Sequence, residues 1–168
     1  YNQGGVEQWV SMYDGPISSY DFGGVIDVDG SGNVYVGGQS LGTSGNFEFA
    51  TVKYTANGVE QWVRREARDY YATILALQLD PIGNVVVAGP VDDFATGGDF
   101  LTVKYQPDGS KLWEAQYDGP KHGFEYAAAL AIDASGNVVV GGISEVVNTY
   151  QDFATVKYSS TGSQQWVQ

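Results

Sequence analysis

Residues 29–38 read Asp-Gly-Ser-Gly-Asn-Val-Tyr-Val-Gly-Gly, and this pattern returns at 80–89 as Asp-Pro-Ile-Gly-Asn-Val-Val-Val-Ala-Gly and at 133–142 as Asp-Ala-Ser-Gly-Asn-Val-Val-Val-Gly-Gly. Gly and Asn tolerate positive φ, so each Gly-Asn pair predicts a tight hairpin turn that leads into a β-strand. The three copies begin 51 and 53 residues apart. Because self-similarity at a nearly fixed period marks a repeat architecture, the chain is organised in units of similar length.

Each unit contains four strand signals. The first is small and apolar (23–28, 74–79, 127–132), as expected of a strand buried on both faces. The second is the Asn-Val run, and the third is Phe-(Ala/Leu)-Thr-Val-Lys-Tyr at 49–54, 100–105 and 153–158. The fourth alternates polar and apolar residues around a Trp, at 59–63, 111–114 and 163–167, with an echo at 6–10.

Four short strands per unit, with turn signals at regular spacing, predict an all-β β-propeller of three four-stranded antiparallel blades. The predicted repeats are about 1–20 (a strand of the fourth type and a loop), 21–71, 72–124 and 125–168, with the blades themselves at 21–64, 72–114 and 125–167. Closed propellers have about 4–8 blades. We therefore expect a fragment or half of a larger closed propeller, since residue 1 aligns with the last residue of a third-type strand.

The units resemble the bacterial β-propeller repeat family often called SBBP. The resemblance rests on Asp-x-x-Gly-Asn-Val-(Tyr/Val)-Val-x-Gly, on (Asp/Glu)-Phe-(Ala/Leu)-Thr-Val-Lys-Tyr, on Gly-x-x-x-Trp and on Tyr-Asp-Gly-Pro at 13–16 and 117–120. The second unit departs from it, with Arg-Arg-Glu-Ala-Arg at 64–68. The resemblance implies an extracellular or cell-surface propeller, of a kind whose function is commonly unassigned.

Composition excludes several classes of partner. The formal net charge is −12 with only 8 Lys and Arg, which argues against nucleic acid, because a phosphate backbone needs a basic surface. No apolar run approaches the roughly 20 residues of a spanning helix, so we expect no membrane insertion. The absence of Cys and the single His argue against a tightly bound transition metal.

Residues that recur in every unit are expected to serve the scaffold. The four tryptophans recur at the same place, so we assign them a structural role in contacts between blades: Trp9, Trp62, Trp113 and Trp166. Lys53, Lys104 and Lys157 also recur, each five residues after an acidic residue. We interpret them as a structural ion pair or hydrogen bond in each blade in preference to a ring of ligand contacts, because a partly buried Lys needs a partner.

Candidate binding residues are those that differ between units and fall in the longer loops at one edge of the sheets. Aromatic rings beside acids are the chemistry of a sugar or cation site, and equally that of an ordinary solvated loop. The candidates are Tyr20, Asp21, Tyr70, Tyr71, Asp92, Asp93, His122, Glu125, Glu145 and Tyr150.

A weak calcium site would use Asp27, Asp29 and Asn33, which match the opening of a calcium-binding loop. An EF-hand would need Glu at the loop position occupied by Gly38, and the other two units have no acid in place of Asp27. A hairpin turn therefore accounts better for this stretch. We expect no other cofactor.

The sequence shows no catalytic constellation, so we predict no catalytic residue. The hypothesis is a non-catalytic binding or structural module that presents its loop edge to a glycan or protein partner. The alternatives are a carbohydrate-active hydrolase or lyase that uses loop carboxylates, and a pure structural spacer. The predicted assembly is either a homo-oligomer, in which two copies form six blades, or completion by further blades of the same chain.

Overall fold

The computed structural model describes residues 1–93, 97–145 and 151–168, with the side chain of residue 93 left out. These residues form thirteen strands in three antiparallel sheets, and none of them lies in a helix. The prediction of an all-β fold made of antiparallel four-strand units is confirmed. The closure of such units into a ring stays a prediction.

The first and third sheets are simple meanders of four strands. The first sheet has the order β1-β2-β3-β4, with β1 Asp21–Val28, β2 Val34–Leu41, β3 Phe47–Tyr54 and β4 Glu60–Glu66. The third has the order β10-β11-β12-β13, with β10 Tyr126–Ile132, β11 Val138–Ser144, β12 Asp152–Tyr158 and β13 Gln164–Val167. The strands follow the predicted signals, because each unit carries its own turns and alternation.

The second sheet has five strands, because two short strands stand in place of one long first strand: β6 forms within the predicted 74–79, and β5 lies before it. Both β5 (Tyr71–Ala72) and β6 (Ala76–Leu79) pair with β7 (Val85–Asp93). On its other side β7 pairs with β8 (Gly97–Tyr105), and β8 pairs with β9 (Lys111–Tyr117). The other sheets have a register shift at the same place. In all three, a side chain at the glycine that faces this place from the neighbouring strand would overlap a backbone carbonyl, as at Gly38, Gly89 and Gly142.

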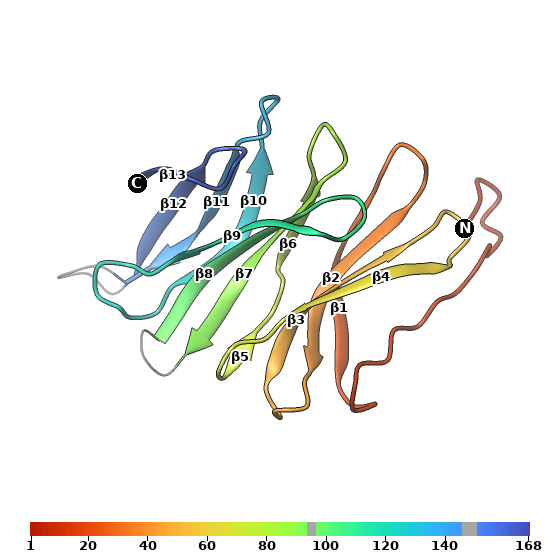
Figure 1. Ribbon diagram of the computed structural model, residues 1–168, viewed down its shortest axis with the longest axis horizontal. Helices are drawn as coiled ribbons and strands as arrows, with labels where there is room; N and C mark the ends of the chain where they lie inside the picture. The colour runs from red at the N-terminus through yellow and green to blue at the C-terminus, as the bar shows by residue number, and fades with distance from the viewer. Residues whose placement is uncertain (94–96, 146–150) are drawn as a thin grey trace.

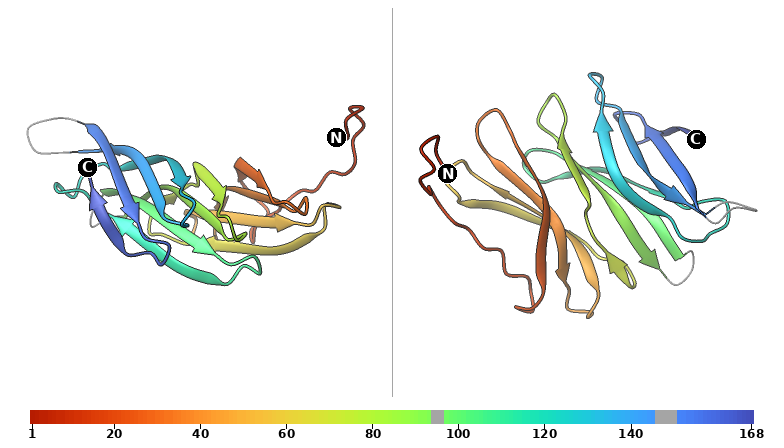
Figure 2. Two further views of the ribbon diagram at one scale, coloured as in Figure 1. Left: turned by 90° about the horizontal axis from the view of Figure 1, so that it is seen from above. Right: turned by 180° about the vertical axis from the view of Figure 1, so that it is seen from behind.

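The three sheets follow one another in chain order, so that the termini lie at opposite ends of the row (Figures 1 and 2). Two cores fill the contacts between neighbouring sheets. One lies between the first and second sheets and includes Phe49, Ile74 and Val87. The other lies between the second and third sheets and includes Phe100 and Val140. The second sheet therefore buries both faces, whereas each end sheet buries one.

Three of the four tryptophans link their unit to the sheet that follows it by a hydrogen bond. The Nε1 atom donates from Trp9 to the Ala56 carbonyl (2.9 Å), from Trp62 to that of Pro107 (3.0 Å) and from Trp113 to that of Ser160 (3.0 Å). Each acceptor lies in the turn between the third and fourth strands of the next sheet. Trp166, in the last sheet, is 40% exposed.

The predicted strand at 6–10 is wrong, because residues 1–20 contain no strand. Trp9 nevertheless packs on Tyr54 with ring centroids 6.2 Å apart, and the Ser11 hydroxyl donates to the Gly58 carbonyl at 2.5 Å. The segment thus docks on the first sheet through side chains. The strands of the fourth type, β4, β9 and β13, each pair with the third-type strand that precedes them in the chain. Residues 6–10 have no third-type strand beside them among the described residues, so they form no β-ladder.

Two of the three recurrent lysines pair with the acid of the hairpin turn, not with the acid five residues earlier. The Lys104 ammonium lies 2.8 Å from the Asp80 carboxylate, and Lys157 lies 3.4 Å from Asp133. In the first sheet, Lys53 instead donates to the Pro107 carbonyl at 2.8 Å. The structural interpretation of these lysines therefore holds for the contacts that the structure shows.

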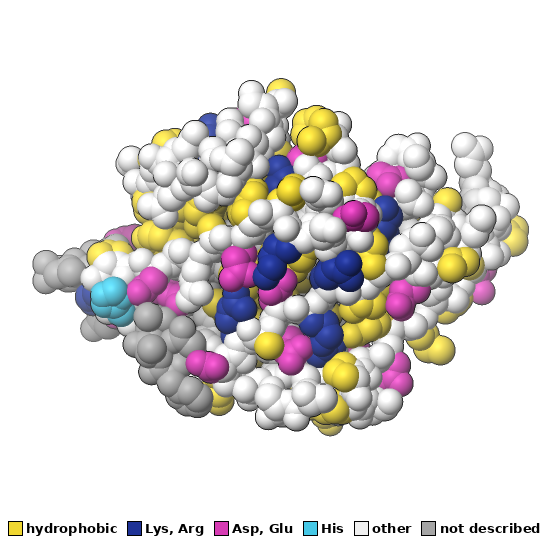
Figure 3. All heavy atoms as spheres, in the orientation of Figure 1, with side chains coloured by type: hydrophobic (Ala, Val, Ile, Leu, Met, Phe, Trp, Pro, Cys, Tyr) yellow, Lys and Arg dark blue, Asp and Glu magenta, His cyan; other side chains and the backbone are white. Residues whose placement is uncertain are grey.

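Charged side chains of both signs gather over the middle of one face of the molecule (Figure 3). Across the first and second sheets, Lys111 lies 2.9 Å from Glu66 and Arg68 lies 3.3 Å from Glu114. Within the part of the chain that is described, no helix is long and apolar enough to cross a membrane.

Candidate functional site

The loop between β9 and β10 is tied closely to the second sheet. Gly98 donates to the Gly123 carbonyl, and the Glu125 amide donates to the Gly98 carbonyl, both at 2.9 Å. His122 has a φ of 51°, and its amide donates to the Gly119 carbonyl at 3.0 Å. These backbone bonds fix the loop against the start of β8, so its side chains converge on one place.

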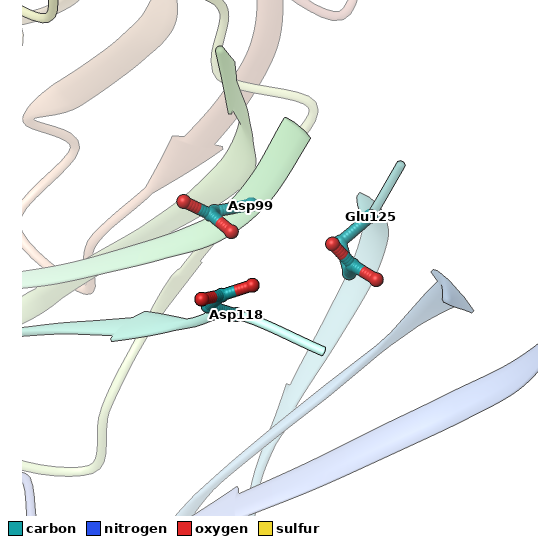
Figure 4. A group of neighbouring side chains, drawn as sticks. All are labelled: Asp99, Asp118 and Glu125. Carbon is teal, nitrogen blue, oxygen red and sulfur yellow. The ribbon is translucent and has the colours of Figure 1, made fainter. Parts of the chain in front are cut away.

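Three carboxylates meet where this loop crosses β8. They belong to Asp99 on β8, Asp118 directly after β9, and Glu125 directly before β10, and one oxygen of each lies within 4.8 Å of the others. Figure 4 shows one carboxylate oxygen of Glu125 pointing toward Asp99 and Asp118. Asp99 and Glu125 have no exposed surface. We call these three residues the acidic cluster.

Neutral donors satisfy part of the acidic cluster. The Gln116 amide donates to Asp99 at 2.6 Å. Glu125 Oε1 accepts from the Ser144 hydroxyl at 3.0 Å and from the Glu145 amide at 3.3 Å. Glu125 Oε2 and Asp118 Oδ1 are buried and accept no hydrogen bond within the described residues.

The electrostatics of the cluster follow from burial and crowding. Burial raises the pKa of Glu125, and the negative charge of Asp118 raises it further, while hydrogen bonds from Ser144, Glu145 and Gly119 oppose the rise. The hydrogen bond and the charge of Asp118 raise the pKa of the exposed His122, whose Nδ1 contacts Asp118 Oδ2. Negative charge is therefore concentrated at the acidic cluster, and the hydrogen-bond donors and His122 offset only part of it.

Several predicted site residues lie around this cluster. Glu125 belongs to it, His122 contacts Asp118, and Glu145 both donates its amide to Glu125 and pairs with Lys121 at 3.3 Å. Asp99 and Asp118 were not among the predicted site residues. Both recur in other units, so a search for residues that differ between units passed over them.

A second group of predicted residues lies at the same edge of the second sheet. Tyr71 on β5 and Asp92 on β7 are direct cross-strand neighbours. Burial raises the pKa of Tyr71, and the nearby Tyr126 and Asp92 raise it further, while a hydrogen bond to Thr73 opposes this. Tyr126 in turn stacks on Phe124, with centroids 6.0 Å apart and an interplanar angle of 18°. Phe124 and Tyr126 were not predicted.

The remaining predicted residues lie apart from these groups or outside the described residues. Tyr20 and Tyr70 are 75% and 60% exposed, and Asp21 accepts from the Gly15 amide at 2.9 Å in the first sheet. The side chain of Asp93 and the whole of Tyr150 lie outside the part that the structure describes.

The predicted calcium ligands Asp27 and Asp29 already accept hydrogen bonds from backbone amides. Asp29 accepts from the amides of Ser31 and Asn33 and from the Asn33 side chain, all at 2.8–2.9 Å. Asp27 Oδ2 accepts from the Leu79 amide at 3.0 Å, which links the first and second sheets. Asp80 accepts the same hydrogen bonds as Asp29 in a turn that lacks the additional acid. Calcium at this turn stays a prediction.

Comparisons with known proteins support a β-propeller family. The family model described as "Domain of unknown function (DUF5122) beta-propeller" matches residues 134–164. Among solved structures, a fucose lectin from Kordia zhangzhouensis in complex with methyl-fucoside is similar, with 15% identity and a TM-score of 0.46 over 85% of this chain and 95% of that one. The search of curated proteins found no match. The more specific SBBP resemblance stays a prediction.

Proposed function

We propose that this chain is a non-catalytic binding module, extracellular or at the cell surface, that binds a glycan at the edge formed by β5, β7 and the start of β10. The observation that carries the proposal is the stacked pair of Phe124 and Tyr126 beside Tyr71 and Asp92. Phe124 is 42% exposed. An exposed ring offers a flat apolar face to a sugar, while a phenol and a carboxylate bind its hydroxyl groups.

Burial of the acidic cluster supports binding over catalysis. Glycoside hydrolysis needs two carboxyl groups in contact with the substrate, one of them acting as a general acid. Asp99 and Glu125 have no exposed surface, so a saccharide at this edge would not reach them. Asp92 lies beside the aromatic rings and would act as a hydrogen-bond acceptor.

A glycan array followed by calorimetric titration of the best glycan tests this proposal. We expect Phe124→Ala and Asp92→Asn each to weaken binding at least about tenfold, or about 1.4 kcal/mol. The control is Phe22→Ala, which removes another exposed ring, from the first sheet. Absence of glycan binding at millimolar concentration would overturn the proposal. So would saccharide turnover that Asp92→Asn abolishes, which would favour the hydrolase alternative.

We also propose that two copies of the chain associate head to tail. The same phenylalanine of the third-type strand is buried in the first two units, where Phe49 is 1% and Phe100 0% exposed, because the next sheet covers it. Its counterpart Phe153, on the last sheet, is 94% exposed. At the outer face of the third sheet, Phe153 therefore stands where the other two sheets bury a phenylalanine, but no described sheet covers it.

The opposite end of the row offers the complementary face. Leu77 and Leu130 contact the preceding sheet from the second and third sheets. Their counterpart in the first sheet, Ile26, is 66% exposed. A second copy would place its Ile26 face on the Phe153 face of the first copy, as in the two contacts between sheets of one chain, except that Trp9 already occupies the docking place that Trp166 of the first copy would otherwise take. Two copies would then complete a ring of six sheets.

Sedimentation velocity of residues 1–168 tests the association. We expect a dimer at micromolar concentration, and a monomer with an unchanged circular dichroism spectrum for Phe153→Glu. Ile82→Glu is the control, because Ile82 is 80% exposed in a turn away from either end face. A wild-type chain that is a folded monomer across this concentration range would contradict the proposal.

A further inference from the structure

The acidic cluster brings three carboxylates together in a largely buried place. Three carboxylates with oxygens within 4.8 Å of one another, two of them fully buried, repel strongly in the low dielectric of the interior. The neighbouring cations are engaged at the exposed rim: Lys121 pairs with Glu145, and the largely exposed His122 contacts Asp118. Such a site either holds a proton or binds a cation.

The first sheet shows how this protein balances an acid at the corresponding position. Glu48, the counterpart of Asp99, forms an ion pair with Arg65 at 2.8 Å. Gln116 occupies the place of Arg65, three residues after the docking tryptophan, and bonds Asp99 at 2.6 Å. The second sheet therefore keeps the hydrogen bond and lacks the positive charge.

Two buried oxygens point to a ligand at this place. Glu125 is fully buried, yet its Oε2 accepts no hydrogen bond among the described residues, and neither does the buried Oδ1 of Asp118. One Glu125 oxygen points toward the other two carboxylates (Figure 4). A buried carboxylate oxygen without a donor is costly. A metal ion bound between the three groups would offer a positively charged partner to the carboxylate oxygens that face one another.

We infer that Asp99, Asp118 and Glu125 bind a hard divalent cation, with Ca²⁺ as the best fit. Calcium takes carboxylate oxygens at about 2.3–2.6 Å, so two ligands of one ion lie at most about 5 Å apart. The three carboxylate oxygens lie within 4.8 Å of one another, which meets this condition. The site lies away from the predicted turn at Asp29, and it does not depend on the glycan proposal.

The location suggests what the ion would do. The three ligands come from β8, from the residue after β9 and from the residue before β10. An ion between them would join the second sheet to the loop that carries Phe124 and to the third sheet. Calcium would therefore stabilise the contact between the second and third sheets. In the first sheet, the cation Arg65 links neighbouring segments in a similar way, by hydrogen bonds to Glu48, Ser40 and Tyr13.

Thermal unfolding and calorimetry of chelator-treated protein with CaCl₂ test the inference. For the wild type we expect saturable binding and a rise in melting temperature of about 5 °C when calcium exceeds its Kd about a hundredfold. Glu125→Gln, which keeps the shape and removes the charge, should weaken calcium binding at least about tenfold. Asp14→Asn, at the counterpart of Asp118 in the first Tyr-Asp-Gly-Pro stretch, should bind calcium like the wild type.

Gln116→Arg gives an independent test, because it places beside Asp99 the cation that Arg65 provides for Glu48 in the first sheet. We expect this variant to melt at a higher temperature than the calcium-free wild type and to lose the response to calcium. No heat and no shift in melting temperature for the wild type at 10 mM calcium would overturn the inference. An undiminished response in both Glu125→Gln and Gln116→Arg would also overturn it, since the ion would then bind elsewhere.

Discussion

Replacing Trp62 by alanine is expected to lower the free energy of unfolding by about 3–5 kcal/mol. The indole is 8% exposed and lies between the rings of Tyr35 and Tyr105, with centroids 6.1 and 6.2 Å away. Its Nε1 also donates to the Pro107 carbonyl at 3.0 Å. The variant therefore loses buried apolar area, leaves a cavity between two sheets and removes their hydrogen bond.

The repeat supplies a matched control for this variant. Trp166 stands at the same place of the last unit but is 40% exposed. Urea unfolding, followed by circular dichroism, should show a much smaller loss for Trp166→Ala than for Trp62→Ala. Equal losses would contradict the docking role of Trp62. The comparison is made well below the dimer dissociation constant, so that association does not mask the difference.

Replacing Lys104 by methionine is expected to cost about 3–5 kcal/mol, because it leaves a buried carboxylate without its cation. The side chains of Lys104 and Asp80 are 3% and 2% exposed, and the charged groups lie 2.8 Å apart. The double variant Asp80→Asn/Lys104→Met should regain much of this loss, since no unpaired charge remains. Unfolding in urea at neutral pH measures both values.

The equivalent pair of the third sheet serves as the control. Lys157 and Asp133 lie 3.4 Å apart with side chains 24% and 40% exposed, so Lys157→Met should change stability little. If Lys104→Met and Lys157→Met had the same effect, burial of the first pair would not be the reason for its strength.

The same pair predicts how stability depends on pH. Burial alone would raise the pKa of Asp80, but hydrogen bonds from Lys104 and Asn84 and the charge of Lys104 lower it below its ordinary value. A carboxyl whose pKa is lower in the folded state contributes stability above its unfolded pKa of about 3.9 and loses it as the pH falls through the folded pKa. We therefore expect the difference between wild type and Lys104→Met to shrink below about pH 4. A difference that stays constant down to pH 2 would contradict this.

The candidate sites show where sequence comparison between units succeeds and fails. Glu125 and His122 were found because they differ from their counterparts Asp21 and Ser18. Asp118 was missed because it recurs as Asp14, although only the later copy lies beside Asp99 and Glu125. A recurring residue can therefore take a local role when its neighbours in space differ, and those neighbours come from other strands.

Local signals in the sequence determined the strands, the hairpin turns and the unit length. Each turn carries its own Asp, Gly and Asn, and the Asp29, Asp80 and Asp133 carboxylates hold the turns through hydrogen bonds at most four residues away. Such contacts form without reference to the rest of the chain. The all-β class could therefore be predicted from the sequence.

Tertiary structure alone decided which of these segments pair and which side chains meet. Residues 6–10 repeat the sequence of a strand but form none, because a strand exists only with a hydrogen-bonded partner. Asp99, Asp118 and Glu125 are separated by up to 26 residues and converge only when β10 packs against the second sheet. Convergence of this kind depends on the packing between sheets, which no local pattern of residues encodes.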